Sequence, residues 1–114
     1  MADGCIFCRI IAGEIPGTFV HQDDEVVAFK DINPVAPVHV LVIPKAHVAC
    51  VDDAGPEHVN ALGSLFLSAK KVAAELKLSQ GYRMVVNNGA NAGQTVFHVH
   101  MHVLGGEPLR GRFA

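Results

Sequence analysis

The chain has 114 residues, half of them apolar, and a formal net charge of −2 with histidine counted as neutral. This length predicts a single domain over residues 1–114, and the balanced charge argues against the basic surface that sequence-independent binding of DNA or RNA requires. Residues 1–4 lack the features of a secretory leader, and no apolar run approaches the ~20 residues of a membrane helix. We therefore expect a cytoplasmic protein with no nucleic-acid or membrane partner.

The first half of the chain predicts a short helix and three strands. Apolar residues at helical spacing predict a helix over residues 5–11. Two short β-rich segments, residues 19–22 and 25–30, flank an Asp-Asp turn and predict a hairpin. The unbroken apolar run at residues 38–43, fenced by prolines, predicts a buried strand that carries one histidine.

The second half predicts a long helix that begins near Pro56 and ends before Gly81. Its expected apolar stripe comprises Val59, Leu62, Phe66, Ala69, Val72, Ala73 and Leu76. Strands follow at residues 82–86 and 98–104, separated by a loop rich in Asn and Gly. The order of elements predicts an α+β fold with a mostly antiparallel five-stranded sheet, one long helix and a short N-terminal helix.

The last predicted strand carries His98, His100 and His102 at alternate positions. Side chains alternate between the two faces of a strand, so the three imidazoles share one face and the apolar residues between them face the core. One outward histidine would be ordinary, but three in register beside a Gly-rich loop indicate a functional site. The residues alone leave two chemistries open: a metal site, or a histidine that attacks phosphorus while its neighbours orient the phosphate.

Residues 98–104, His-Val-His-Met-His-Val-Leu, resemble the His-φ-His-φ-His-φ-φ signature of the histidine-triad (HIT) family, in which φ is apolar. Further blocks resemble that family in the same order, among them residues 13–16, 29–32, 37–45 and 82–87. The His-Val-Leu-Gly-Gly sequence that ends the triad resembles the Hint-like nucleotide-binding branch more than the dinucleoside polyphosphate hydrolases. The resemblance implies a HIT-like fold, a homodimer and a nucleotide hydrolase or transferase.

The resemblance also assigns catalytic roles. It implies that His100 is the nucleophile, with its Nδ1–H held by a backbone carbonyl, and that His102 contacts a non-bridging phosphate oxygen. His39 would orient His102 from another strand, although without the triad it would be read as a core histidine. Gln94 and Thr95 match positions that the family uses at the phosphate and leaving group.

The implied ligand is a purine nucleotide of the AMP or GMP type. Asp31 would accept hydrogen bonds from both ribose hydroxyls, and Asn87 and Gly93 would lie near the phosphate. The remaining pocket positions are Ile6, Phe7, Ile10, Ile32, Leu41 and Val96. Without the resemblance, Asp31 would be a turn residue, and Ile10 and Leu41 would be ordinary core residues.

The C-x-x-C motif at Cys5 and Cys8 has two interpretations besides a pair of unligated thiols. A redox motif of the thioredoxin type would need a preceding strand, which is missing here. Certain bacterial HIT proteins bind zinc through this cysteine pair, a histidine after the Pro-Lys block and the first triad histidine; the matching residues are His47 and His98. The resemblance therefore implies a closed structural zinc site and no catalytic metal.

The predicted function is a phosphoramidase-like hydrolase of purine nucleoside 5′-phosphoramidates or lysyl-adenylate-type adducts, with a nucleotidyl-histidine intermediate on His100. The alternatives are a dinucleoside polyphosphate hydrolase and a nucleotide-binding scaffold without turnover. Residues 107–114 depart from the Trp-Pro-Pro-Gly ending of many Hint-like members, which leaves the leaving-group preference open.

The expected dimer also has support from the residues. The short apolar strand at residues 82–86 would pair with its copy if it lies at the sheet edge. Gly63, Ser64 and Ser68 on the long helix are small enough to let a partner approach closely.

Overall fold

Five antiparallel strands form one sheet in the computed structural model, which describes residues 4–111. In the order β1-β2-β3-β5-β4, the strands are β1 Phe19–Gln22, β2 Val26–Lys30, β3 Val38–Pro44, β5 Met101–Gly105 and β4 Tyr82–Val85. The first three residues and the last three of the tail lie outside the described part. The predicted α+β architecture and the edge position of β4 are confirmed.

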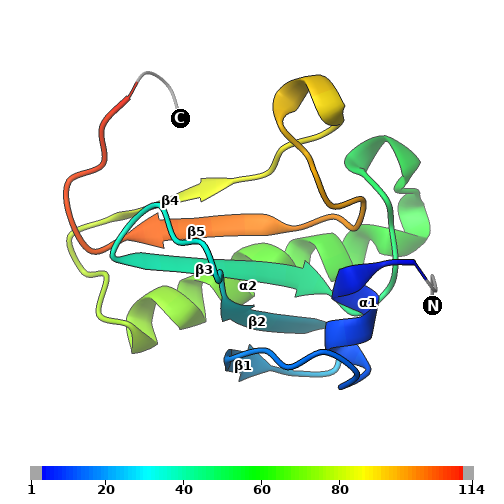
Figure 1. Ribbon diagram of the computed structural model, residues 1–114, viewed down its shortest axis with the longest axis horizontal. Helices are drawn as coiled ribbons and strands as arrows, with labels where there is room; N and C mark the ends of the chain where they lie inside the picture. Colours follow the sequence, from blue (N-terminus) through cyan, green and yellow to red (C-terminus); the bar gives the residue numbers. More distant parts are fainter. Residues whose placement is uncertain (1–3, 112–114) are drawn as a thin grey trace.

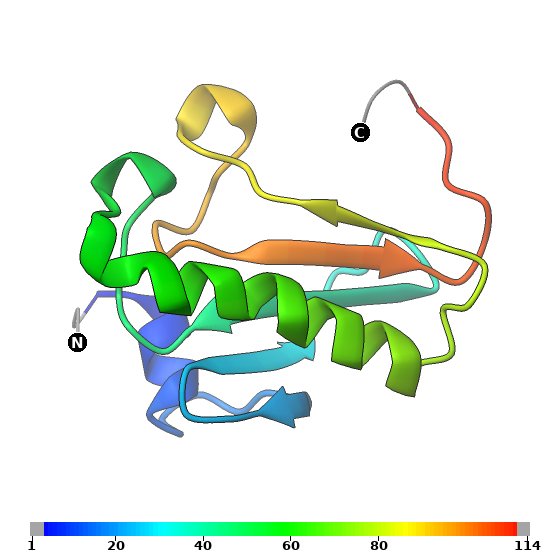
Figure 2. The same ribbon diagram turned by 180° about the vertical axis from the view of Figure 1, so that it is seen from behind.

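Two helices lie on opposite faces of this sheet (Figures 1 and 2). The short helix α1, Ile6–Ile11, begins at Cys5, whose sulfur accepts a hydrogen bond from the backbone N–H of Cys8 at 3.4 Å. A 3-10 turn, Pro56–His58, leads into the long helix α2, Val59–Glu75. Among residues 4–111, no helix is both long enough and apolar enough to cross a membrane.

The alternation of side chains along the strands divides the interior into two cores. On β2, Val26 and Ala28 pack under α2, whereas Val27 and Phe29 pack under α1. Because both faces are covered, β3 is buried along almost its whole length, as its unbroken apolar run predicts. The α1 side of the sheet carries the candidate site.

The predicted apolar stripe of α2 is partly wrong. Val59 and Phe66 are exposed, and Leu65 is buried in their place. Apolar side chains occupy more of the surface of α2 than the sheet can cover. The sheet covers the face that carries Leu65, Ala69 and Val72. Ser68 also lies in this buried part, so the prediction that it contacts a partner is wrong.

The last strand begins at Met101, three residues later than predicted. Pairing with β3 starts at the Val42–Met101 pair, and the backbone N–H of Val99 instead donates to the Val48 carbonyl at 2.7 Å. The predicted alternation of faces nevertheless holds, because Val99, Met101 and Val103 are all buried in the core beneath α2.

Candidate active site and metal centre

His100 lies just before β5, and its ring nitrogens have distinct roles. Nδ1 lies 2.8 Å from the backbone carbonyl oxygen of His98, which can only accept a hydrogen bond. In the neutral ring, Nδ1 therefore carries the proton and Nε2 presents a lone pair. The Phe7 ring packs edge-on against the imidazole at 5.2 Å, with an angle of 87° between the rings. This arrangement supplies the backbone-held tautomer expected of the nucleophile.

A chain of hydrogen bonds fixes the tautomers of the other two imidazoles. The Val35 backbone N–H donates to Nδ1 of His39 at 3.1 Å, so Nε2 of His39 carries the proton. That Nε2–H donates to Nδ1 of His102 at 2.9 Å. His102 consequently carries its own proton on Nε2, which suits it to donate to a phosphate oxygen.

Burial keeps this pair of imidazoles neutral. Desolvation and, to a lesser extent, the nearby rings of His100 and His39 together lower the pKa of His102 to about 4, against an opposing effect of Asp31. Desolvation also lowers the pKa of His39, again against Asp31. Both rings are therefore neutral donors and acceptors at neutral pH.

Asp31 lies beside this hydrogen-bonded chain. Its Oδ2 lies 3.3 Å from Nε2 of His39, and its Oδ1 accepts a hydrogen bond from the Asn33 backbone N–H at 2.8 Å. The potential ligand atoms of Asp31, His39 and His102 lie within 4.8 Å of one another. A metal there would need a lone pair on Nε2 of His39. That nitrogen carries the ring proton, because Nδ1 accepts the hydrogen bond from the Val35 N–H. We therefore interpret the trio as a hydrogen-bonded pair of imidazoles beside the Asp31 carboxylate.

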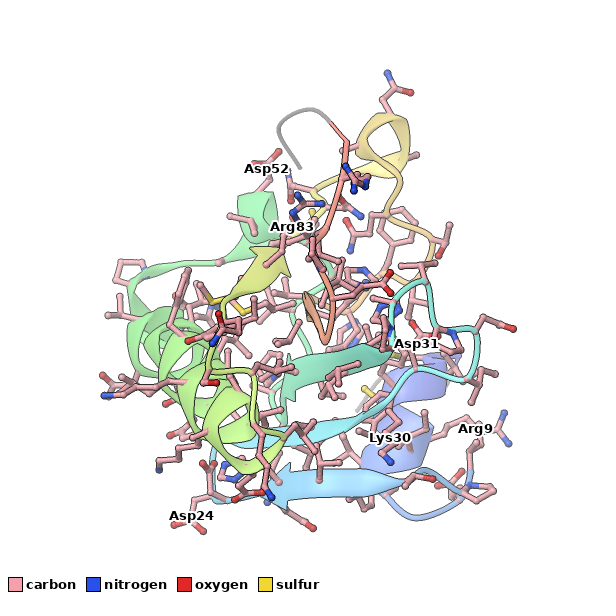
Figure 3. All side chains as sticks on the ribbon, turned by 90° about the vertical axis from the view of Figure 1, so that its left-hand side faces the viewer. Arg9, Asp24, Lys30, Asp31, Asp52 and Arg83 are labelled. Carbon is pink, nitrogen blue, oxygen red and sulfur yellow. The ribbon has the colours of Figure 1, made fainter. Side chains whose placement is uncertain are left out.

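A cavity of about 770 Å³ opens beside these groups on the α1 side of the sheet. This volume suits a small-molecule ligand. Figure 3 shows α1 and α2 on opposite sides, with Asp31 on the α1 side. The expected residues that line the cavity are Ile6, Phe7, Ile10, Asp31, Ile32, His39, Leu41, Thr95, Val96, His100 and His102. The cavity wall therefore combines apolar side chains with three imidazoles.

A second cluster joins Cys5, Cys8, His47 and His98, whose potential ligand atoms lie within 4.8 Å of one another. Nδ1 of His98 lies 3.5 Å from Sγ of Cys5 and 3.6 Å from Sγ of Cys8. Nδ1 of His47 lies 3.3 Å from Sγ of Cys8 and 3.2 Å from Nδ1 of His98. Neighbouring donors of a tetrahedral zinc ion stand roughly 3.3–3.8 Å apart, so this Cys–His cluster fits a metal ion and is compatible with zinc.

The surroundings of His98 support this fit. Its ring is completely buried, and Nε2–H donates to the Pro44 carbonyl oxygen at 2.7 Å. That hydrogen bond leaves the lone pair of Nδ1 directed at the two sulfurs. Metal-binding histidines are commonly oriented by a hydrogen bond of this kind from the other ring nitrogen.

Comparison with known proteins places the chain in a family. The HIT domain family profile matches residues 12–109. The chain belongs to the histidine-triad family. An uncharacterised HIT-like protein of Synechocystis is 54% identical over 109 residues, which cover 96% of each chain. The purine nucleoside phosphoramidase of Escherichia coli K12 is 46% identical over 110 residues, 96% of this chain and 92% of that protein.

Solved HIT structures agree with this assignment. A HIT family hydrolase from Clostridium thermocellum superposes with a TM-score of 0.96 at 44% identity, over 100% of both chains. A histidine triad protein from Clostridium difficile gives a TM-score of 0.93 at 41% identity, over 97% of both chains. The predicted HIT-like fold is thereby confirmed.

Three predicted phosphate-site residues of this HIT protein, Asn87, Gly93 and Gln94, do not line the cavity. The buried Gln94 side chain accepts from the Gly89 N–H at 2.8 Å and donates to the carbonyl oxygens of Ala49 and Val96 at 2.8 and 3.0 Å. It therefore braces the loop that carries the next two cavity residues. A direct contact of these three residues with phosphate stays a prediction.

Sequence reasoning missed several residues of the cavity wall. They are Ile15, Pro16, Gly17, Thr18, Phe29, Lys30, Asn33 and Val35. Phe29 could have been predicted from the sequence, since it alternates with Ala28 on a buried strand and precedes Asp31 by two positions. The role of the Val35 N–H could not have been predicted, because its hydrogen bond to His39 depends on the conformation of the intervening loop.

Proposed function

We propose that this HIT protein is a nucleotide hydrolase of the phosphoramidase type, acting on purine nucleoside 5′-phosphoramidates or lysyl-adenylate-type adducts. The observation that carries the proposal is the backbone contact of His100, which keeps the proton of the neutral ring on Nδ1 and leaves the Nε2 lone pair for attack, in a cavity that His102 also lines. The similarity to the Escherichia coli phosphoramidase supports the same substrate class.

In the first step, Nε2 of His100 attacks the α-phosphorus and forms a P–N bond. The bond from phosphorus to the amine breaks, and the amine leaves with its electron pair and a proton taken from water. The imidazole becomes a cation, and its Nδ1–H continues to donate to the His98 carbonyl. Water then attacks phosphorus and breaks the P–N bond to His100. The proton that this water loses neutralises the hydroxide left by the first step, the nucleoside monophosphate departs and His100 is neutral again.

The neighbouring residues bind and orient the nucleotide. Nε2–H of His102 donates to a non-bridging oxygen, where negative charge develops during attack. Asp31 accepts hydrogen bonds from the ribose hydroxyls, and the purine packs against the apolar wall formed by Ile6, Phe7 and Ile10. In this proposal the base packs against these apolar side chains and phosphorus lies beside the imidazoles.

We also propose that the Cys–His cluster holds one zinc ion. A closed set of two thiolates and two imidazoles gives a structural site, so the ion supplies folding stability and no step of the reaction. Protein purified without chelator should contain about one zinc per chain, and the double variant Cys5→Ser, Cys8→Ser should contain none. Zinc-free wild-type protein would contradict this assignment.

The function is tested by incubating the protein with adenosine 5′-phosphoramidate and measuring AMP. Wild-type protein should release AMP, and His100→Ala should lose turnover by several orders of magnitude while still binding AMP. Diadenosine tetraphosphate is the matched competitor substrate. Faster cleavage of it would favour the dinucleoside polyphosphate hydrolase, and binding without turnover of either substrate would favour the scaffold.

A further inference from the structure

The Cys–His cluster contacts the proposed active site through three separate parts of the chain. We propose that a metal ion in this cluster positions His100 and the nucleotide pocket, and so affects ligand binding and the nucleophile as well as stability. The inference rests on the proposed role of His100 as the nucleophile. His98, α1 and the segment after β3 are the three connections.

The most direct connection is His98, which belongs to both sites. Nδ1 of its imidazole lies 3.5 and 3.6 Å from the two sulfurs of the cluster, and its backbone carbonyl accepts the Nδ1–H of His100 at 2.8 Å. A shift of the His98 ring after metal loss moves the carbonyl that selects the tautomer of His100. Without that acceptor the proton can reside on Nε2, and an Nε2–H has no lone pair with which to attack phosphorus.

The second connection is α1, which carries both sulfurs and one wall of the cavity. Phe7 lies between the two cysteines in sequence, and its ring packs against His98 at 6.0 Å and His100 at 5.2 Å. A helix of six residues is too short to be stable alone, so its position depends on its attachments. Coordination by Cys5 and Cys8 would fix α1, and with it the part of the cavity wall formed by Ile6, Phe7 and Ile10.

The third connection is the segment that begins at His47. The carbonyl oxygen of the next residue, Val48, accepts a hydrogen bond from the Val99 N–H at 2.7 Å. The Ala49 carbonyl accepts a hydrogen bond from the Gln94 side chain at 2.8 Å. A metal held by His47 therefore anchors the backbone on both sides of His98 and the loop that leads into the cavity.

A metal that only stabilised the fold would act differently. It would raise the free energy of unfolding, but a metal-free protein that remained folded would bind nucleotide with unchanged affinity. Dissociation constants and imidazole tautomers, measured far below the unfolding temperature, therefore separate the two roles.

The experiment compares zinc-loaded wild-type protein with Cys8→Ser and with chelated wild type, each checked for folding by circular dichroism. AMP affinity is measured by calorimetry, and the tautomer of His100 by ¹⁵N NMR of its imidazole. Loss of zinc should weaken AMP binding about tenfold or more and should move proton population from Nδ1 to Nε2 of His100. Adding zinc back should restore both in chelated wild type.

Two control variants keep the cluster intact. Cys50→Ser removes a thiol outside the cluster, and Val72→Ala weakens the core on the α2 side of the sheet. Both should keep the wild-type AMP affinity and tautomer. The proposal is overturned if folded, zinc-free protein matches wild type in both measurements, or if wild type takes up no zinc. Neither measurement requires turnover, so a failed phosphoramidase assay would count against the proposed function alone.

Discussion

At the scale of single residues, hydrogen-bond direction decides what each imidazole can do. The carbonyl of His98 makes Nε2 of His100 a lone-pair donor, and the N–H of Val35 makes Nε2 of His102 a proton donor through His39. The sequence predicted which histidines act and, by resemblance, the backbone partner of His100. It did not predict Val35, since a loop N–H carries no side-chain signature.

The lowered pKa of His102 predicts a pH dependence of stability. Between its ordinary pKa of 6.5 and its folded value of about 4, the unfolded chain binds a proton that the folded protein does not. This contribution is complete above pH 6.5 and is lost as the pH falls towards 4. Denaturation at pH 7 and pH 5 should show a smaller loss of stability for His102→Gln than for wild type. Equal losses would contradict the folded pKa of about 4.

The assignment of Asp31 to the ribose predicts a ligand-dependent effect. Asp31→Asn should weaken AMP binding by about 1.5–3 kcal/mol, because it removes a charged acceptor from the ribose hydroxyls. The same substitution should change the affinity for 2′,3′-dideoxy-AMP much less, which calorimetry can measure. If both ligands lose the same affinity, Asp31 acts only through His39, from which it lies 3.3 Å.

At the scale of elements, periodicity predicted which helices and strands form better than it predicted where they begin and which of their residues are buried. The predicted strand at residues 98–104 begins at Met101, because the neighbouring backbone leaves the sheet to meet Val48. On α2, apolar side chains occupy more of the surface than the sheet can cover, so spacing alone did not distinguish Leu65 from Phe66. Both errors come from tertiary packing that a local pattern does not contain.

The burial on α2 gives a matched pair of substitutions. Leu65→Ala should lower the free energy of unfolding by about 2–5 kcal/mol, because it leaves a cavity under the helix. Leu67→Ala should cost much less, since Leu67 is 64% exposed. Urea denaturation measures both. A larger loss for Leu67→Ala would contradict the orientation of α2.

At the scale of the whole molecule, the fold brings together residues that lie far apart in the sequence. The resemblance to the HIT family predicted the four residues of the Cys–His cluster and most residues of the cavity wall. The fold brings the members of each set close together. What the sequence could not give is the connection between the two sites. His98 joins them through its ring and its carbonyl, and only the three-dimensional structure shows where each points.

We expect a twofold homodimer in solution. Phe66 on α2 is 57% exposed, and Met84 lies on the α2 side of the edge strand β4, opposite the buried Val103. Exposed apolar side chains beside an unpaired edge favour a second copy. Light scattering should give about twice the 12.1 kDa chain mass, and Phe66→Glu should shift the protein towards monomer. A monomer at all micromolar concentrations would refute this expectation.

The covalent intermediate on His100 is the central claim, and rapid-quench mass spectrometry tests it most directly. Wild-type protein mixed with adenosine 5′-phosphoramidate and quenched at high pH should carry one added adenylyl group, on the peptide that contains His100. The His100→Ala variant should carry none. Turnover without any adenylylated peptide, or an adenylyl group on His98 or His102, would contradict the account.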